Sequence, residues 1–461
     1  MKRLHAPLAW VNGRWQREVL LTVENGHWTE VAPGVPAPED AERLAGPLIP
    51  SLVDAHSHAF QRAFAGLAER REAGQDDFWS WRDRMYALAL RISPQQLRAV
   101  ASQLYAELLR GGYTQVCEFH YLHHPADPAH GGQAFEDELD MAWALTSAAE
   151  DAGIGLTLLP VVYTRSGFGA GGLRPDQHRF AADADWAWRA CQRVLAAGLP
   201  RVNAGVALHS LRGAAPEDIA RLRRLVGGAE LPIHVHVAEQ TAEVADCLAA
   251  TGMRPLQWLA AQGHLDARWQ LVHATHAEPA EIEAVARSGA GIVICPGTEA
   301  NLGDGLCDLP RWLGHGVPLT VGSDSQVTRG WVEELRWLEY GQRLLLRQRN
   351  VAALPGGHAG AQPSSAARLF DAAVSGGARA AGFAAWGLRP GARADALVLK
   401  READALRGLP DEALLDAVVF GSNGSPWQSV WVAGRARPWR EPERVGEAFE
   451  AAMRALWSQA G

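Results

Sequence analysis

Short apolar segments alternate with amphipathic stretches through most of this 461-residue chain. The apolar segments predict strands near residues 47–54, 113–119, 154–162, 202–208, 231–237, 269–273, 290–295 and 318–322. The stretches between them have helical periodicity, as in 93–112, where Ser93 precedes Pro94 as a helix N-cap would. Repeated strand–helix order is typical of a parallel sheet, and eight such strands close into a barrel. We therefore expect an α/β fold, a (β/α)8 TIM-like barrel.

The two ends of the chain have a different pattern. Residues 1–47 contain short alternating segments with an Asn-Gly turn signal in each, which is typical of hairpins. Residues 388–440 contain further strand-like segments, among them "ADALVLK" and "SVWVAGRARP". We expect both ends to pair into one small β-domain, beside a catalytic barrel formed by 48–387. A helix is expected over 441–461.

Composition excludes several classes of function. A net charge of −8 leaves no basic surplus for nucleic-acid phosphates, and no apolar run approaches the length of a membrane span. The five cysteines are scattered and never form C-x-x-C, which favours reduced thiols in a cytoplasmic protein. Because Lys2 and Lys400 are the only lysines, a lysine nucleophile or base is excluded between them.

Histidines and carboxylates cluster at the carboxyl ends of the predicted strands. They are His56 and His58 on the first, His209 on the fourth, His236 and Glu239 on the fifth, His273 on the sixth and Asp324 on the eighth. In a parallel barrel all these ends lie on one face, where barrel enzymes build their sites. The order of the residues therefore predicts one shared site.

Three imidazoles and one carboxylate suit zinc or another borderline divalent cation, which lowers the pKa of a bound water to near 7. The candidate ligands are His56, His58, His236 and Asp324. The spacing of the first two also fits polar residues that simply close a strand. Because distant strands supply further potential ligands, we favour the metal site over this alternative.

Two more residues are candidates for proton transfer. Glu239 lies three residues beyond His236, so it can carry a proton from water to a leaving nitrogen. His273 can orient or deprotonate the water, and Asp324 can share that role. The alternative for Glu239 is a helix-start residue placed favourably in the helix dipole.

Other histidines and one arginine are expected to have structural roles. His234 shares a strand face with His236 but is expected to be a hydrogen-bonded barrel residue, and His276 is expected to be a loop residue. A second histidine group, in "FHYLHHP", consists of His120, His123 and His124, where metal binding is the less favoured alternative. A lone Arg212 would by default be a surface cation.

The combined motifs resemble the amidohydrolase superfamily: H-x-H on a first strand, H-x-x-E on a fifth, His on a sixth and Asp on an eighth. Members of this superfamily that bind two metals commonly bridge them with a carboxylated barrel lysine. The absence of a barrel lysine here therefore favours the mononuclear deaminase and chlorohydrolase branch. Within it, the chain is similar to the formimidoylglutamate deiminase family over about 50–330. The segments that carry this similarity are "HSHAFQRAFAGL", "DDFWSWRDRMY", "EFHYLHH", "LHSLRG", "HVAEQ", "LVHATH", "CPGTEANLGDG" and "GSDS".

This resemblance implies hydrolysis of N-formimino-L-glutamate to N-formyl-L-glutamate and ammonia, in histidine degradation, by a homodimer with one Zn²⁺, or alternatively Fe²⁺, per chain. The implied catalytic residues are Glu239, His273 and Asp324. The implied substrate contacts are Gln61, Arg82, Tyr121, His209 and Arg212. Two arginines suit a small dicarboxylate substrate, because each guanidinium binds a carboxylate through two parallel hydrogen bonds. The alternatives are a deaminase of another amidine or of a heterocycle in the same branch, and a catalytically silent barrel used for assembly.

Overall fold

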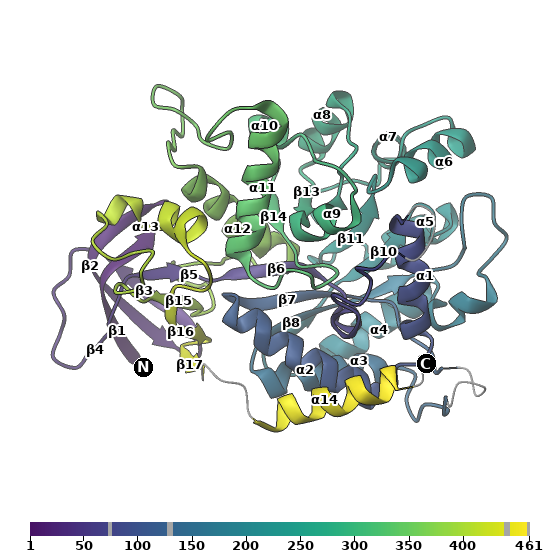
Figure 1. Cartoon of the computed structure of the whole chain (residues 1–461), viewed down its shortest axis with the longest axis horizontal. Helices are drawn as coiled ribbons and strands as arrows, with labels where there is room; N and C mark the ends of the chain where they lie inside the picture. The colour runs from purple at the N-terminus through teal and green to yellow at the C-terminus, as the bar shows by residue number, and fades with distance from the viewer. Residues whose placement is uncertain (72–75, 127–131, 438–442, 459–461) are drawn as a thin grey trace.

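The computed structural model describes residues 1–71, 76–126, 132–437 and 443–458. Its larger sheet contains eight parallel strands, in the spatial order β6-β7-β8-β10-β11-β12-β13-β14, with a short β9 beside β8 (Figure 1). The strands are β6 (Leu52–Ser57), β7 (Tyr113–His120), β8 (Gly155–Val162), β9 (Val202–Ala204), β10 (Val206–Ser210), β11 (Ile233–Val237), β12 (Trp269–His273), β13 (Gly291–Ile294) and β14 (Leu319–Val321). The predicted order of barrel strands is confirmed.

The first and last strands of this sheet close on each other. Ser57 and Asp324 form a parallel bridge, and the Asp324 amide donates to the His56 carbonyl at 2.9 Å. The His58 amide donates back to the Asp324 carbonyl at 3.2 Å. Gly322 makes this approach possible, because an added Cβ there would lie 2.7 Å from the Cβ of His56. The barrel therefore closes at the residues that carry the candidate ligands.

Helices surround the barrel in the expected alternation (Figure 1). They are α1 (Phe78–Ala89), α2 (Pro94–Arg110), α3 (Asp140–Ala152), α4 (Ala184–Ala196), α5 (Pro216–Val226), α6 (Thr241–Thr251), α7 (Pro255–Ala261), α8 (Pro279–Ser288), α9 (Pro296–Leu302), α10 (Leu309–Gly314), α11 (Trp331–Leu346) and α12 (Ser365–Ala380), with 3₁₀ turns η1 (Ala59–Ala63) and η3 (Pro175–Phe180). Ser93 caps α2 as predicted, since its side chain accepts the Gln96 amide at 3.2 Å. Among the described helices, none is both long and apolar enough to cross a bilayer.

The second sheet combines both ends of the chain, as the sequence predicted. Its order is β17-β16-β15-β5-β1-β2-β3, with β4 beside β1. The strands are β1 (Lys2–Val11), β2 (Arg14–Glu24), β3 (His27–Ala32), β4 (Glu42–Arg43), β5 (Leu48–Pro50), β15 (Ala396–Leu399), β16 (Trp427–Val432) and β17 (Arg435–Arg437). The C-terminal α14 (Glu443–Trp457) lies along α2 (Figure 1). Residues 438–442 and 459–461 of the predicted β-domain and helix lie outside the described residues.

Two predicted strands are each two strands in the structure. The segment 47–54 divides at Ser51: Ile49 pairs with Leu397 in the small sheet, whereas Leu52 pairs with Tyr113 in the barrel. The segment 202–208 divides at Gly205, where an added Cβ would lie 2.5 Å from the Pro232 carbonyl oxygen. Both parts of the first segment are buried and apolar, so hydrophobicity alone does not distinguish the sheets to which they belong.

Candidate metal and substrate site

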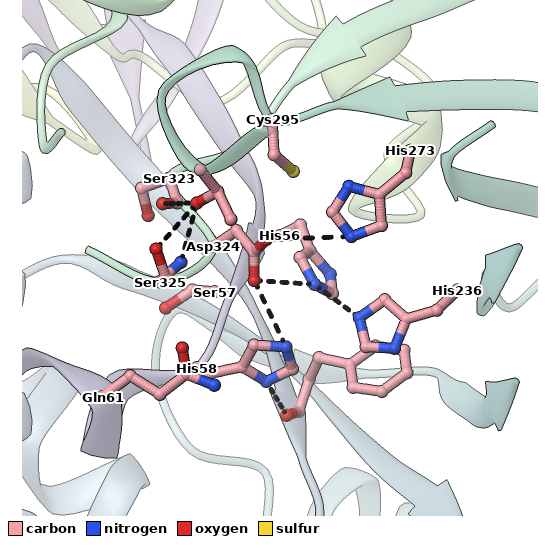
Figure 2. A network of polar contacts seen from close by, with 12 residues as sticks. His56, Ser57, His58, Gln61, His236, His273, Cys295, Ser323, Asp324 and Ser325 are labelled. Carbon is pink, nitrogen blue, oxygen red and sulfur yellow. Dashed lines mark hydrogen bonds and ion pairs between the residues drawn. The ribbon is translucent and has the colours of Figure 1, made fainter. Parts of the chain in front are cut away.

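Four histidines and one aspartate meet at the mouth of the barrel (Figure 2). They are His56 of β6, His58 directly after β6, His236 of β11, His273 of β12, and Asp324 just after β14. All five are buried. We call these residues the mouth cluster. The structure thus brings together all four side chains predicted as metal ligands.

The distances between donor atoms suit one tetrahedral cation. Nε2 of His56 lies 2.9 Å from Nε2 of His236, and Oδ1 of Asp324 lies 3.5 Å from His56 Nε2 and 3.4 Å from His58 Nε2. Two ligands bound about 2.1 Å from a tetrahedral zinc ion are separated by about 3.4 Å. The potential ligand atoms form two groups that share His56, one with His58 and Asp324 and one with His236 and His273, so a single cation held by the four predicted ligands would draw the two groups together.

The protonation states favour the same role. Burial lowers the pKa of His56 to about 3 and also lowers the pKa values of His58 and His236, so these rings are neutral. His58 Nδ1 donates to the Phe119 carbonyl at 3.0 Å, which leaves its Nε2 lone pair facing Asp324. Burial acts to raise the pKa of Asp324, but the neighbouring imidazoles outweigh it and hold that pKa below its usual range.

His273 lies among three carboxylates. Its Nε2 is 3.8 Å from Glu239 Oε1 and 3.7 Å from Asp324 Oδ2, whereas its Nδ1 is 3.2 Å from Glu299 Oε1. Burial acts to lower the pKa of His273, but the charges of these carboxylates outweigh it and raise that pKa. Glu299 was given no role from the sequence. Its only signal was an acidic residue just after a predicted strand, in "CPGTEANLGDG".

Glu239 has the properties that a proton carrier requires. It is buried beside the mouth cluster, and burial raises its pKa to about 7 against the opposing charge of His273. A carboxyl group with a pKa near neutrality can both accept and release a proton under ordinary conditions. Glu239 precedes α6 by two residues, so its position also agrees with the alternative of a helix-start residue placed favourably in the helix dipole.

The backbone at two of these residues is in the left-handed region. His273 has φ of 70° and Asp324 has φ of 50°, a conformation that costs on the order of 1–3 kcal/mol at a non-glycine residue. Neighbouring contacts hold the aspartate in place, since Asp54 accepts from the amide of Ser323 at 2.8 Å and from its hydroxyl at 2.5 Å. Such strain is typical of functional sites.

The five predicted substrate contacts line the same pocket as four members of the mouth cluster, namely His58, His236, His273 and Asp324. The five contacts are Gln61, Arg82, Tyr121, His209 and Arg212. Gln61 donates to the Tyr121 hydroxyl at 3.3 Å, and the Tyr121 ring lies 5.0 Å from the His58 ring. The His209 ring lies 5.4 Å from the His236 ring. One continuous pocket therefore joins the metal ligands to the predicted substrate residues.

Two arginines face this pocket with unused donors. The guanidinium groups of Arg82 and Arg212 lie 4.6 Å and 5.2 Å from the centre of the Trp79 ring. Nε of Arg82 and Nη1 of Arg212 are buried and have no hydrogen-bond partner among the described residues. Arg82 has a weak ion pair with Asp83, at 3.6 Å. Buried cationic donors without acceptors are costly, so this part of the pocket is suited to bind an anion.

Three histidines outside the mouth cluster each direct Nε2 at a backbone carbonyl oxygen. His234 Nε2 donates to the Ala380 carbonyl at 2.8 Å, as expected for a barrel residue. His123 Nε2 lies 3.0 Å from the Val161 carbonyl oxygen, and His124 Nε2 lies 2.6 Å from that of Ala181. Within the described part of the chain, no group of three potential ligand atoms includes His120, His123 or His124.

Comparisons with known proteins agree with this geometry. The model of the amidohydrolase family matches residues 48–437. A formimidoylglutamate deiminase from Pseudomonas aeruginosa is 44% identical over 94% of both chains. The crystal structure of an amidohydrolase from Brucella melitensis is 39% identical, with a TM-score of 0.91 over 99% of this chain and 100% of that one. An adenosine deaminase from Xanthomonas campestris with bound zinc shares the fold, at 23% identity and a TM-score of 0.79 over 99% and 98% of the two chains.

Proposed function

The chain belongs to the amidohydrolase family and to its formimidoylglutamate deiminases, and we propose that it hydrolyses N-formimino-L-glutamate to N-formyl-L-glutamate and ammonia. The observation that carries this proposal is the pair of buried, unpartnered donors on Arg82 and Arg212, in one pocket with the mouth cluster. A substrate with two carboxylates would supply acceptors for both. A purine or pyrimidine, which has no carboxylates, would not supply charged acceptors to these two buried donors.

The proposed cofactor is one divalent metal per chain, zinc in the first instance and iron(II) as the alternative, since both accept imidazole and carboxylate ligands. His56, His58, His236 and Asp324 would hold it. When bound, such a cation polarises a water and lowers its pKa to near 7, which supplies a nucleophile at neutral pH.

The protein's own groups would handle the protons. Glu239 is the proposed carrier: it first delivers one proton of the attacking water to the terminal nitrogen of the formimino group, and then transfers the second proton of the same oxygen to that nitrogen as the carbon–nitrogen bond breaks. The water oxygen becomes the formyl oxygen, the bond from carbon to the terminal nitrogen breaks, and that nitrogen leaves as ammonia. His273, fixed at Nδ1 by Glu299, orients the water between Glu239 and Asp324.

The substrate would be positioned by the other pocket residues. Arg82 comes from α1 and Arg212 from the loop after β10, so the two guanidiniums approach the pocket from different parts of the chain. Each is suited to bind one carboxylate through parallel hydrogen bonds. His209, Gln61 and Tyr121 lie toward the mouth cluster and would contact the formimino end.

The test combines metal analysis with an ammonia-release assay. We expect release from N-formimino-L-glutamate and none from guanine or cytosine assayed in parallel. Arg82→Ala should keep its metal but raise KM about 10- to 100-fold, because it loses hydrogen bonds to a charged group. Arg349→Ala, at an exposed arginine, is the matched control. Unaltered kinetics in Arg82→Ala would remove the case for a dicarboxylate.

The proposed reaction would serve histidine degradation, in which an earlier step must generate the formimino group and a later one must remove the formyl group. Homodimerisation and a cytoplasmic location stay predictions from the sequence. Ultracentrifugation of the purified protein would test the first of these directly.

A further inference from the structure

Two tyrosines line the pocket near the arginines. Tyr86 belongs to α1, one helical turn after Arg82, and Tyr163 directly follows β8. They are 6% and 5% exposed, and their hydroxyl oxygens lie 3.4 Å apart. Gln177 of η3 lies behind them with an exposure of 1%, and its Nε2 is 3.3 Å from Tyr86 Oη and 3.1 Å from Tyr163 Oη.

The orientation of the Gln177 amide is set by its other contact. Its Oε1 accepts the backbone N–H of Arg174 at 3.1 Å. Because a backbone N–H can only donate, the oxygen must occupy that side and the NH₂ group must face the tyrosines. Each of the two amide protons is therefore available to one phenol oxygen, and both tyrosines act as acceptors toward Gln177.

The number of hydroxyl protons on the two tyrosines determines how many hydrogen bonds they can still donate into the pocket. Each phenol has a single O–H to donate. The contact between the two hydroxyls uses at most one of these protons, and at 3.4 Å it is a long contact. At least one buried hydroxyl must therefore find its acceptor elsewhere, and both residues border the pocket.

The surroundings indicate the charge of that acceptor. The Arg82 guanidinium lies 5.5 Å from the centre of the Tyr86 ring, and the Tyr163 ring lies 4.2 Å from the ring of His209. Arg82 and Arg212 both act electrostatically on Tyr163. The free O–H thus lies in the same pocket as the two guanidiniums whose donors are themselves unpartnered.

We propose that Tyr163, supported by Tyr86, donates a hydrogen bond to a substrate carboxylate held by the arginines, and that Gln177 is the positioning residue that keeps both phenols oriented as donors. This proposal rests on the proposed function and deepens it. It makes this end of the pocket rich in hydrogen-bond donors, which favours a carboxylate over a carboxamide, whose N–H groups would face the guanidinium donors.

Removing the hydroxyl is the first test. Tyr163→Phe should raise KM for N-formimino-L-glutamate about 10- to 100-fold, the range for a hydrogen bond to a charged group, with kcat changed much less. Tyr113→Phe is a matched control, because the buried Tyr113 hydroxyl has no partner among the described residues and lies at the start of β7.

Reversing the polarity of Gln177 is the second test. In Gln177→Glu the new carboxylate accepts from the phenols, turns their protons away from the substrate and adds a negative charge, so KM should rise at least as much as in Tyr163→Phe. Gln348→Glu is the control for the same change at an exposed position. Gln177→Met should raise KM in the wild-type background but not in Tyr86→Phe/Tyr163→Phe, because it acts through those hydroxyls.

Truncated substrates complete the design. N-formimino-4-aminobutanoate lacks the α-carboxylate, and N-formimino-2-aminobutanoate lacks the side-chain carboxylate. The Tyr163→Phe penalty should disappear with one of them, which identifies the carboxylate contacted, and an equal penalty with both would overturn the proposal. An inactive wild type would overturn the proposed function, whereas an active wild type with unchanged KM in Tyr163→Phe would overturn this inference alone. Tyr163→Phe decides the matter if Gln177→Glu does not fold.

Discussion

Two groups of histidines lie in this barrel, and they use their ring nitrogens differently. In the mouth cluster, His56 and His236 face each other through Nε2 at 2.9 Å, and Asp324 approaches within 3.5 Å. In the group that follows β7, His123 and His124 each direct Nε2 at a backbone carbonyl oxygen. Both groups lie at carboxyl ends of barrel strands.

The comparison teaches that histidine density along the chain is a poor guide to metal binding. The "FHYLHHP" segment has the denser group, but Nε2 of His123 and Nε2 of His124 are already directed at backbone carbonyl oxygens. The mouth cluster comes from strands at both edges of the sheet, and its nitrogens converge on a carboxylate. A cation held by the four predicted ligands would satisfy their lone pairs, and Asp324 supplies a negative charge that the second group lacks.

The largest effect should come from removing a nitrogen of the mouth cluster. In His236→Ala we expect metal affinity to fall by more than the roughly 10- to 100-fold that losing an outer hydrogen-bond partner costs, and ammonia release to fall with it. His123→Ala should retain both properties. Metal content by mass spectrometry, measured beside the activity, checks this. Full metal content in His236→Ala would show that the cation binds elsewhere. The two histidine groups would then no longer differ in metal binding.

A smaller effect is expected from a substitution of Glu239, the proposed proton carrier. Glu239→Gln should retain its metal but lose about 10²- to 10⁴-fold in kcat, because the amide cannot take up or release a proton at this point. Glu283→Gln provides the same change at an exposed residue and should have no effect. Steady-state kinetics with metal analysis separate the two roles. Undiminished turnover of the loaded variant would assign proton transfer to another group, with His273 the first to examine.

The smallest effect is expected in the second group, and on stability. His123→Phe leaves the buried Val161 carbonyl without its donor, so the free energy of unfolding should fall by about 1–3 kcal/mol. Metal content and KM should not change. Denaturant unfolding of this variant, with the exposed His358→Phe as control, measures the loss. A drop in metal content would show that the two histidine groups are not independent.

Much of the fold could be predicted because buried parallel strands form continuous apolar segments. The positions of His56 and Asp324 at strand ends followed from the same pattern. The division at Ser51 could not be predicted, since Ile49 and Leu52 are equally buried in different sheets. Glu299 was missed because its partner His273 is 26 residues away and only the assembled barrel brings them together.

The network around Gln177 was missed for a related reason. Its two phenol partners lie 91 and 14 residues away along the chain, on different elements. A glutamine, a helical tyrosine and a tyrosine at a strand end carry no joint signal in sequence. Contacts of this kind depend on how loops pack above the barrel, which periodicity does not encode.

Asp324 bridges to Ser57 where the first and last barrel strands meet, so the ring cannot open there without displacing a candidate ligand. A chain that has assembled only some of its strands would therefore have no competent site, and the protein could acquire its cofactor only after assembly is complete. Metal uptake during refolding would then report the step in which the first and last barrel strands pair. A molecule cut into two fragments should recover uptake only when the fragments restore that junction.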